Sequence, residues 1–316
     1  MNKKPLIILT GPTAVGKTSL SINLARAVNG EIISADSMQV YEFMDIGTAK
    51  ITPEEMEDIP HYLISEFKPD EEFSVVKFQK YAKNYIKSIH NRNKIPILVG
   101  GTGFYIQSVL YDIGFDENPS DTSYRTELEH MAKTKGSDYL HGLLTSLDPE
   151  SAKVIHPNNT KRIIRALEYI KQTGKPISAH NEEQRSKESP YNYSYFVLNR
   201  DRETLYNIIN QRVDGMIEKG LIDEVKQLMS MGYTKSMVSM QGLGYKEIID
   251  YLEGNSTLNE AIEILKKETR HYAKRQVTWF KREKDIAWIN KDDFKDDSDI
   301  IEYLVKNLLE KGIVKT

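Results

Sequence analysis

The amino-acid sequence predicts an α/β protein with a P-loop NTPase-like parallel sheet flanked by helices, and with a helical insertion domain. Three observations lead to this prediction. Short apolar runs alternate with segments of helical spacing over residues 5–99, the first run leads into a glycine-rich phosphate-loop pattern, and strand-like patterning stops between residues 116 and 188. Strands that alternate with helices form parallel sheets through right-handed crossovers.

Residues 1–115 form the first part of the expected catalytic core. The apolar run that begins at Pro5 is a strand, and the spacing of Leu20, Leu24 and Val28 indicates the helix that follows. A second apolar run around Ile33 suits a sheet that is buried on both faces. The expected elements are strands at 5–10, 31–36 and 95–99 and helices at 19–28 and 73–92.

Residues 116–188 form the expected insertion, and residues 189–316 complete the core. Gly174 and Pro176 close the last long helix of the insertion. A capping-box pattern beginning at Thr257 opens the longest helix of the C-terminal part. The expected elements are insertion helices at 122–135, 137–146 and 159–173, a strand at 193–198, and helices at 203–219, 221–231, 244–253 and 258–283.

Composition restricts the function classes. The 316 residues include no cysteine, which excludes disulfides, thiolate metal sites and cysteine nucleophiles and fits a reducing cytoplasm. No apolar stretch approaches the roughly 18 residues of a membrane span, and we expect no signal peptide before the first strand. The formal net charge is −3, so nucleic-acid binding needs a local patch; segment 266–284 carries eight Lys or Arg against two Glu.

Residues 11–18 fit the phosphate-loop pattern, in which spaced glycines precede a lysine and a threonine. The loop follows a strand and opens a helix, as this motif requires. Its backbone N–H groups surround phosphate oxygens, Lys17 adds a positive charge, and the Thr18 hydroxyl can bind Mg²⁺. The residues expected to hold a diphosphate or a nucleotide are Gly11, Pro12, Thr13, Ala14, Val15, Gly16, Lys17 and Thr18.

An acid at the end of the second expected strand separates this chain from a standard ATP motor. In such motors an acidic Mg²⁺ partner follows a later strand. Here the strand that ends at Val99 leads into a Gly-Gly-Thr-Gly turn at 100–103. Asp36 ends a neighbouring strand, and the carboxyl ends of parallel strands meet at one crevice. The residues alone leave Asp36 open as a magnesium ligand, a helix N-cap or a general base.

Several motifs together resemble one family, the bacterial tRNA dimethylallyltransferases, over nearly the whole chain. The phosphate loop is the only piece that is specific by itself, and the order and spread of the pieces make the likeness specific. The pieces are Gly11–Thr18, Ile33–Tyr41, Met44–Lys50, Val99–Thr102, His156–Asn158, Arg165–Glu168, Gly242–Glu247 and Ala273–Phe280.

The resemblance implies a prenyl transfer in which the N6 amine of the adenosine 3′-adjacent to the anticodon attacks dimethylallyl diphosphate. It implies that Asp36 is the general base, that Lys17 and Arg212 bind the leaving diphosphate, and that Thr18 and Mg²⁺ assist. The chemistry is coherent. An adenine amine is a weak nucleophile because its lone pair is delocalised, so a carboxylate that takes its proton promotes attack, and cations stabilise the charge that gathers on diphosphate.

The resemblance also implies that the anticodon stem–loop of tRNA is a partner. The insertion could be a lid, a tRNA clamp or only a decoration of the fold, and His156, Lys161, Arg162 and Arg165 favour a clamp on the anticodon stem. On the helix at 258–283, one ridge of basic residues is expected to face RNA phosphates, with aromatic residues and Gln276 on another face. The ridge comprises Lys267, Arg270, Lys274 and Lys281, and the other face comprises Tyr272, Gln276 and Trp279. The residues expected near tRNA are Asp36, Ser37, Met38, Gln39, Thr102, Arg125, Lys161, Arg162, Ile163, Ile164, Arg165, Gln241, Gly242, Leu243, Gly244, Tyr245, Lys246, Lys274, Arg275 and Gln276.

Three other functions remain to be weighed. A small-molecule or nucleotide kinase also has a phosphate loop and an acid after the second strand, and it would consume ATP. An RNA-binding regulatory NTPase would need the acidic strand end that is missing after Val99. A relative that prenylates free AMP would not need the large insertion or the basic helix. We expect a cytoplasmic monomer that uses Mg²⁺ and binds no membrane, and we leave open whether ATP binds the phosphate loop.

Overall fold

The computed structural model of the chain describes residues 3–115 and 123–315. Its contacts divide into a large unit, Met1–Leu110 with Pro190–Thr316, and a small unit, Tyr111–Ser189. The start predicted for the insertion, at residue 116, and the helix start predicted at Thr122 lie outside the described residues. Among the described residues, no helix is both long and apolar enough to cross a membrane.

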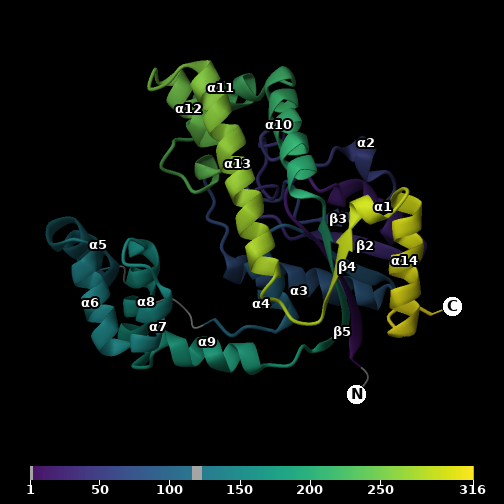
Figure 1. The fold of residues 1–316 in the computed structure, drawn as a ribbon, viewed down its shortest axis with the longest axis horizontal. Helices are drawn as coiled ribbons and strands as arrows, with labels where there is room; N and C mark the ends of the chain where they lie inside the picture. Colours follow the sequence, from purple (N-terminus) through teal and green to yellow (C-terminus); the bar gives the residue numbers. More distant parts are fainter. Residues whose placement is uncertain (1–2, 116–122, 316) are drawn as a thin grey trace. The chain divides into compact units, whose positions relative to one another are not determined.

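The large unit is built on a six-stranded sheet in which every neighbouring pair is parallel, with the order β3-β2-β4-β1-β5-β6 (Figure 1). Residues 6–9 of β1 are completely buried, as expected for an inner strand covered on both faces. The α/β fold predicted from the sequence is confirmed. The strands are β1 (Lys4–Thr10), β2 (Gly30–Ser34), β3 (His61–Tyr62), β4 (Ile95–Gly100), β5 (Tyr191–Asn199) and β6 (Ile286–Asn290).

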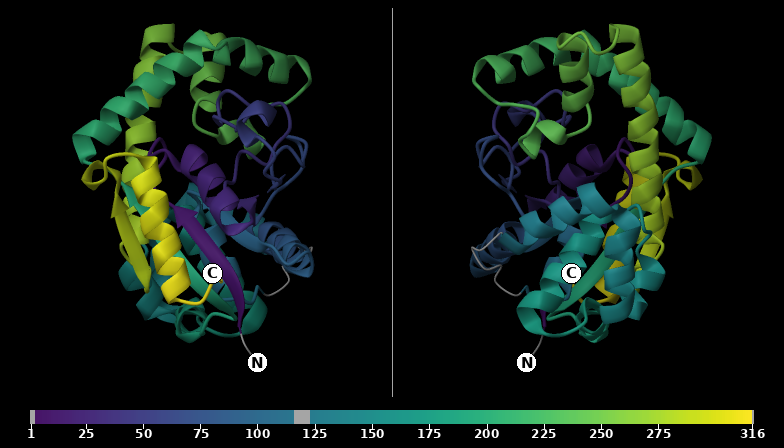
Figure 2. Two further views of the ribbon diagram at one scale, coloured as in Figure 1. Left: turned by 90° about the vertical axis from the view of Figure 1, so that its right-hand side faces the viewer. Right: turned by 90° about the vertical axis from the view of Figure 1, so that its left-hand side faces the viewer.

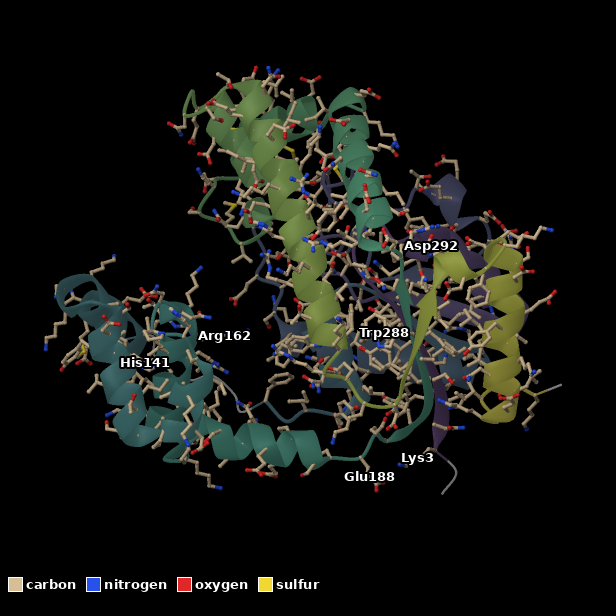
Figure 3. The ribbon with its side chains drawn as sticks, viewed as in Figure 1. Lys3, His141, Arg162, Glu188, Trp288 and Asp292 are labelled. Atoms are coloured by element: carbon tan, nitrogen blue, oxygen red, sulfur yellow. The ribbon has the colours of Figure 1, made fainter. Side chains whose placement is uncertain are left out.

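Two strands, β3 and β6, were not predicted. Strand β3 has two residues, too few to show a period. Strand β6 is an edge strand whose apolar run, residues 286–289, is short, and its central Trp288 is 38% exposed (Figure 3). A run of this length cannot be told from part of a buried helix by periodicity. The prediction for β2 was also wrong at its end. The strand stops at Ser34, because a turn begins at Asp36, whose carboxylate accepts a hydrogen bond from the Met38 N–H.

Helices cover both faces of this sheet. Helix α14 packs on α1, and α13 packs on α10, α12 and α4 (Figures 1 and 2). The capping box predicted at Thr257 and Glu260 is confirmed at the start of α13. The helices of the large unit are α1 (Lys17–Val28), α2 (Pro53–Met56), α3 (Val75–Asn91), α4 (Gly103–Leu110), α10 (Arg202–Glu218), α11 (Leu221–Ser230), α12 (Tyr245–Leu252), α13 (Leu258–Phe280) and α14 (Asp297–Glu310), with short 3₁₀ turns at Ser239–Gln241 and Lys291–Asp293.

The small unit is entirely helical in its described residues, with one apolar core of its own. Its longest helix ends at Gly174, in the left-handed conformation, as the sequence predicted, and Asn159 caps the start of this helix. Its helices are α5 (Ser123–Lys135), α6 (Ser137–Leu147), α7 (Pro149–Val154), α8 (Thr160–Thr173) and α9 (Ile177–Ser186). The expected placing of Ile163 and Ile164 against tRNA needs correction. Both side chains lie in this core, where they are 0% and 6% exposed, so they are not accessible to RNA.

Replacing Ile163 with alanine tests this assignment. The side chain is 0% exposed, so we expect Ile163→Ala to lower the stability of the small unit by about 2–5 kcal/mol through the cavity that it leaves. Hydrogen exchange of α6 and α8 amides measures the change. Lys161→Ala, on the exposed face of the same helix, should change stability by less than about 0.5 kcal/mol. Equal protection in the two variants would contradict the core position.

Candidate active site

The loop between β1 and α1 lies at the carboxyl edge of the sheet, where its glycines are needed for close approach. Gly11 has φ +146°, and a Cβ on it would lie 2.5 Å from Leu198 O in β5. Gly16 has φ +89° and forms the N-cap of α1. The loop therefore presents its backbone N–H groups and the N-terminus of α1 on one side, which is the arrangement that binds phosphate oxygens.

Three of the four predicted catalytic residues are close enough to interact electrostatically, although they come from three separate elements. Burial and then the positive charge of Arg212 lower the pKa of Lys17 to about 7, while the negative charge of Asp36 acts in the opposite direction. Burial also lowers the pKa of Arg212, again opposed by Asp36. Lys17 Nζ donates to the carbonyl oxygens of Gly11 and Pro12, at 3.0 and 2.8 Å. The site thus combines two partly desolvated cations with one carboxylate.

The carboxylate of Asp36 has a defined orientation. Its Oδ1 accepts hydrogen bonds from the backbone N–H groups of Met38, at 2.8 Å, and Gln39, at 3.3 Å. Neither of these contacts uses Oδ2, the oxygen left for a proton or a ligand. No helix begins after Asp36, because residues 37–40 form bends and turns, so Asp36 is not a helix N-cap. Its Oδ1 closes a turn instead, and Oδ2 is left for the role of base or metal ligand.

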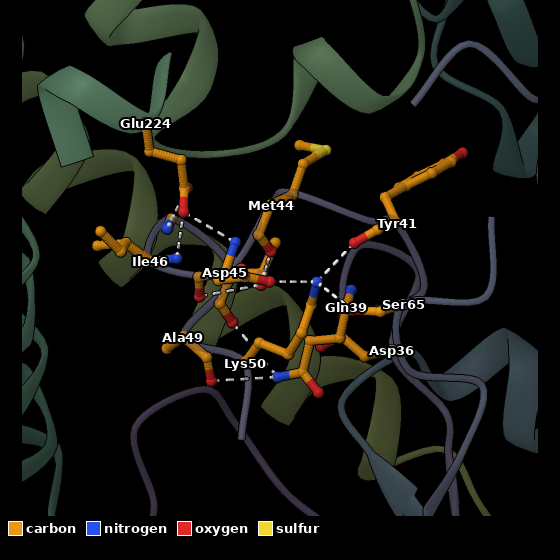
Figure 4. A network of polar contacts seen from close by, with 12 residues as sticks. Asp36, Gln39, Tyr41, Met44, Asp45, Ile46, Ala49, Lys50, Ser65 and Glu224 are labelled. Atoms are coloured by element: carbon orange, nitrogen blue, oxygen red, sulfur yellow. Dashed lines mark hydrogen bonds and ion pairs between the residues drawn. The ribbon is translucent and has the colours of Figure 1, made fainter. Parts of the chain in front are cut away.

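The loop that follows Asp36 is held by a network of polar contacts (Figure 4). Glu224 of α11 accepts hydrogen bonds from the backbone N–H groups of Asp45, Ile46 and Gly47, at 2.9, 2.7 and 3.0 Å, and from the Tyr245 hydroxyl at 2.7 Å. One carboxylate thus fixes three successive backbone groups.

The same network connects to the turn that begins at Asp36 through the side chains of Lys50 and Gln39. Lys50 Nζ donates to Tyr41 O, to Asp45 Oδ1 and to Ser65 Oγ, at 2.5, 2.6 and 2.8 Å. Gln39 Nε2 donates to the carbonyl oxygens of Thr48 and Ala49, at 3.3 and 3.4 Å. Since Gln39 N–H also binds Asp36, the loop and the carboxylate are connected through this one residue. The amide nitrogen of Gln39, predicted to face tRNA, is thus already used within the protein.

The Gly-Gly-Thr-Gly turn at 100–103 lies against the inner face of α13. A Cβ on Gly103 would lie 2.2 Å from Trp279 Cδ1, and a Cβ on Gly101 would lie 2.1 Å from Gln276 Nε2. Burial, and next the negative charge of Asp36, raise the pKa of the Tyr272 hydroxyl on the same helix face. The predicted grouping of Tyr272, Gln276 and Trp279 on one face of the helix agrees with these contacts.

Three side chains predicted to face RNA or its phosphates form hydrogen bonds within the protein instead. Tyr245 is completely buried, with its hydroxyl on Glu224. Gln276 is 6% exposed and bonded to backbone groups. Arg270 of the expected ridge donates to Asn210 of α10 and is half-buried. Sequence periodicity identified the faces of α13 but not the partners within the fold.

Other basic residues of the prediction do lie at the surface of their units. Lys274 and Arg275 are exposed on α13, and Lys161 and Arg162 are exposed on α8, where Figure 3 labels Arg162. Arg125 is partly exposed, but its Nε and one terminal nitrogen donate to the two carboxylate oxygens of Glu168, at 2.9 and 2.8 Å. These positions suit contact with RNA phosphates, although Arg125 already pairs with the carboxylate of Glu168.

The remaining residues expected near tRNA come from three segments of the large unit, around residues 37–38, 102 and 241–246, and from Arg165 in the small unit. Ser37, Met38 and Thr102 are partly buried beside the Asp36 turn, and a Cβ on Gly242 would meet the end of the Met38 side chain. Gln241 is exposed, and Lys246 lies 3.5 Å from Glu247. Leu243, Gly244 and Arg165 complete the predicted set; Gly244 is buried, whereas Leu243 and Arg165 are partly exposed.

Comparison with known proteins now adds to this geometry. The sequence profile of the IPP transferase family matches residues 39–283. The chain is 63% identical to a tRNA dimethylallyltransferase of Lachnoclostridium phytofermentans, over 99% of this chain and 100% of that protein. The chain belongs to the IPP transferase family.

Solved structures of the family share the fold. A full-length tRNA isopentenylpyrophosphate transferase from Bacillus halodurans is 46% identical, with a TM-score of 0.74 over 98% of both chains. A eukaryotic dimethylallyltransferase, solved in the course of acting on tRNA, is 32% identical, with a TM-score of 0.83 over 99% of this chain and 81% of that one. The α/β fold described above is thus the fold of known family members.

Two residues of this IPP transferase that support the site were missed by sequence reasoning. Glu224 looks like an ordinary helix acid, because its partners are backbone N–H groups that leave no trace in the sequence. Lys291 follows the unpredicted strand β6, is buried, and pairs with Asp297 at 2.7 Å. Its Nζ would lie 3.0 Å from a Cβ on Gly16, so the C-terminal segment lies against the phosphate loop. Only the sheet order could have revealed this proximity.

Burial of the Lys17 charge makes the stability of the protein depend on pH. Because the pKa of Lys17 is about 7 in the folded protein and 10.5 in an unfolded chain, the unfolded state binds more protons between these values. Lys17 therefore lowers stability most below pH 7, and this cost fades as pH rises towards 10. We expect Lys17→Met to abolish transfer and to raise the unfolding temperature more at pH 6.5 than at pH 9. The same shift at both pH values would contradict the burial of this charge.

Glu224 is expected to anchor the loop that follows Asp36. Glu224→Ala leaves three backbone N–H groups and the Tyr245 hydroxyl without their acceptor, so we expect a loss of about 2–4 kcal/mol of stability and a lower turnover number. Urea unfolding and steady-state kinetics measure the two effects. Asp223→Ala is the matched control, because Asp223 forms only an exposed ion pair with Lys226 and should cost less than about 1 kcal/mol. Equal effects of both changes would refute the anchoring role.

Proposed function

We propose that this enzyme transfers a dimethylallyl group from dimethylallyl diphosphate to the N6 amine of the adenosine 3′-adjacent to the anticodon in tRNA, with release of diphosphate. Its relatives at 63% and 53% identity are named tRNA dimethylallyltransferases. The observation that carries the proposal is the grouping of Asp36 with Lys17 and Arg212 beside the phosphate loop. A base beside two cations suits an attack that creates one negative leaving group.

The proposed reaction uses these residues in distinct roles. The N6 nitrogen forms a bond to C1 of the dimethylallyl group as the bond from C1 to the diphosphate oxygen breaks. The electron pair of the broken bond goes to diphosphate, where Lys17, Arg212 and the loop N–H groups stabilise it. The proton of the amine goes to Asp36, whose Oδ1 is held by backbone N–H groups while Oδ2 is left to accept it.

Mg²⁺ is part of the proposal, and the residues present fit it. Thr18 lies in the first turn of α1 with its side chain exposed, at the position that supplies a hydroxyl ligand in phosphate loops. No group of three or more His, Cys, Asp or Glu that could hold a metal occurs in the described part of the chain. Mg²⁺ prefers few protein ligands and completes its shell with phosphate oxygens and water. When bound, it would neutralise charge on the diphosphate.

The RNA contacts are proposed from the exposed cations of each unit. Lys274 and Arg275 present positive charge on α13, and Lys161 and Arg162 do so on α8. Since the net charge of the chain is −3, such local groups must supply the attraction to RNA phosphates. We propose that the small unit grips the anticodon stem, and that the enzyme is a cytoplasmic monomer.

The direct test is transfer without ATP. Purified enzyme is incubated with unmodified tRNA, labelled dimethylallyl diphosphate and Mg²⁺, and the nucleosides are analysed. We expect N6-dimethylallyladenosine as the product. Absence of transfer to every tRNA of a complete pool, together with ATP consumption, would overturn the proposal in favour of a kinase.

Asp36→Asn tests the role of the carboxylate. Asparagine keeps an oxygen that can accept from the Met38 and Gln39 N–H groups, so the loop should remain folded. We expect the turnover number to fall at least about 100-fold, because a general base typically contributes 10²–10⁴-fold, while affinity for dimethylallyl diphosphate and Mg²⁺ dependence stay as in the parent. A loss of Mg²⁺ dependence instead would identify Asp36 as a metal ligand.

A further inference from the structure

Gln276 of α13 joins two loops that are far apart in the sequence. Its Oε1 accepts a hydrogen bond from the backbone N–H of Thr13, in the phosphate loop, at 2.8 Å. Its Nε2 donates to the carbonyl oxygen of Gly101, in the Gly-Gly-Thr-Gly turn, at 2.9 Å. The side chain is 6% exposed, so both hydrogen bonds are shielded from water. Each end of the amide thus has one backbone partner in a different loop.

The surroundings of Gln276 leave the amide little freedom. A Cβ on Gly101 would lie 2.1 Å from Nε2, so the backbone approaches the amide as closely as a residue without a side chain allows. One turn further along α13, Trp279 lies against Gly103 in the same way. The helix therefore packs on the turn at two successive positions. Buried polar groups in such surroundings are costly to leave unpaired, because water cannot replace the lost partner.

The amide has a requirement that other side chains do not meet. One end must accept from an N–H group and the other must donate to a carbonyl group, within a single planar group. A glutamate would place an oxygen against Gly101 O, and a methionine or leucine would leave both backbone groups without partners. Asparagine is one methylene shorter and cannot span both loops from the same backbone position. The chemistry of this position thus selects glutamine.

We propose that Gln276 is a positioning residue that sets the shape of the phosphate loop for diphosphate binding, rather than a contact to RNA. Because the Thr13 N–H is bound to Gln276, the diphosphate would be held by the later N–H groups of the loop and by Lys17. Gln276 sets the position at which the N–H groups available to diphosphate begin along the loop. It also sets the distance between the phosphate loop and the Gly101 turn beside Asp36. This inference rests on the proposed function and names a determinant of its diphosphate site.

The same helix bears the exposed cations Lys274 and Arg275. Residues two positions apart on a helix point to different sides, so Lys274 and Gln276 face solvent and the loop respectively. Two functions therefore lie on opposite faces of one rigid element. A change at Gln276 should affect the diphosphate site, whereas a change at Lys274 should affect RNA.

The test compares Gln276→Met with the matched control Gln227→Met, in which an exposed glutamine of α11 undergoes the same substitution. Inorganic diphosphate with Mg²⁺ is titrated into each variant by calorimetry, and tRNA affinity is measured by filter binding. We expect Gln276→Met to weaken diphosphate binding roughly five- to tenfold, since it removes two buried hydrogen bonds. Affinity for tRNA should stay within about twofold, and Gln227→Met should match the parent in both assays.

Gly101→Ala provides a second route to the same effect without changing Gln276. Its Cβ would displace the Gln276 amide, so we expect a similar loss of diphosphate affinity. Gly101→Ala combined with Gln276→Ala should bind diphosphate no worse than Gly101→Ala alone, because both changes remove the same two hydrogen bonds. Additive losses would overturn the shared mechanism. This variant also serves if Gln276→Met fails to fold.

The outcomes separate this inference from the proposed function. A loss of tRNA affinity with diphosphate binding unchanged would show that Gln276 contacts RNA and overturn the inference. Diphosphate binding equal to that of the parent in both Gln276→Met and Gly101→Ala would also overturn it. Failure of the proposed function would appear in the parent enzyme itself, as absence of transfer to tRNA. In steady-state transfer, the supporting result is a higher KM for dimethylallyl diphosphate with the KM for tRNA unchanged.

Discussion

The mutual repulsion of Lys17 and Arg212, held beside Asp36, is the interaction on which the rest of the site depends. Two cations taken partly out of water raise the free energy of the folded state, and a single carboxylate offsets part of this. The structure must therefore hold the two cations together against their mutual repulsion, while Asp36 attracts both of them. The sheet places the loop of Lys17 and the turn of Asp36 at one edge, and α10 brings Arg212 to them. A bound diphosphate, which is strongly negative, would offset the mutual repulsion of these two cations.

Rigid support for this arrangement comes mainly from contacts between side chains and the backbone. Glu224 fixes the loop after Asp36, Gln276 joins the phosphate loop to the Gly101 turn, and the carboxylate of Asp36 itself closes a turn. Glu224 and Gln276 bind backbone groups of distant segments, whereas Asp36 binds backbone groups two and three residues further along the chain. Such contacts constrain position more strictly than apolar packing does, because hydrogen bonds are directional. Preorganised charge is effective in catalysis when it does not have to move during the reaction.

The sequence predicted the elements that have a clear period and the residues that belong to a recognisable motif. Four strands and the long helices carry continuous apolar runs or helical spacing, and the phosphate-loop pattern located Lys17 and Thr18. Strands β3 and β6 were missed because β3 has two residues and the apolar run of β6, residues 286–289, is too short to identify a strand by its period. Gln276 was placed on the correct face of its helix and expected near tRNA, but the backbone groups of Thr13 and Gly101 that it binds were not identified. Its partners are backbone groups, which any residue provides, so no sequence pattern could identify them.

The position of β6 in the sheet has a consequence for how the chain acquires activity during synthesis. The phosphate loop is among the first segments made, yet Lys291 lies against Gly16 and α14 packs on α1. These contacts join segments separated by nearly the length of the chain, and such non-local contacts form late in folding. While residues 286–310 are still within the ribosome, the first loop lacks these neighbours. A nascent chain would therefore complete its diphosphate site only after its last strand and helix have emerged.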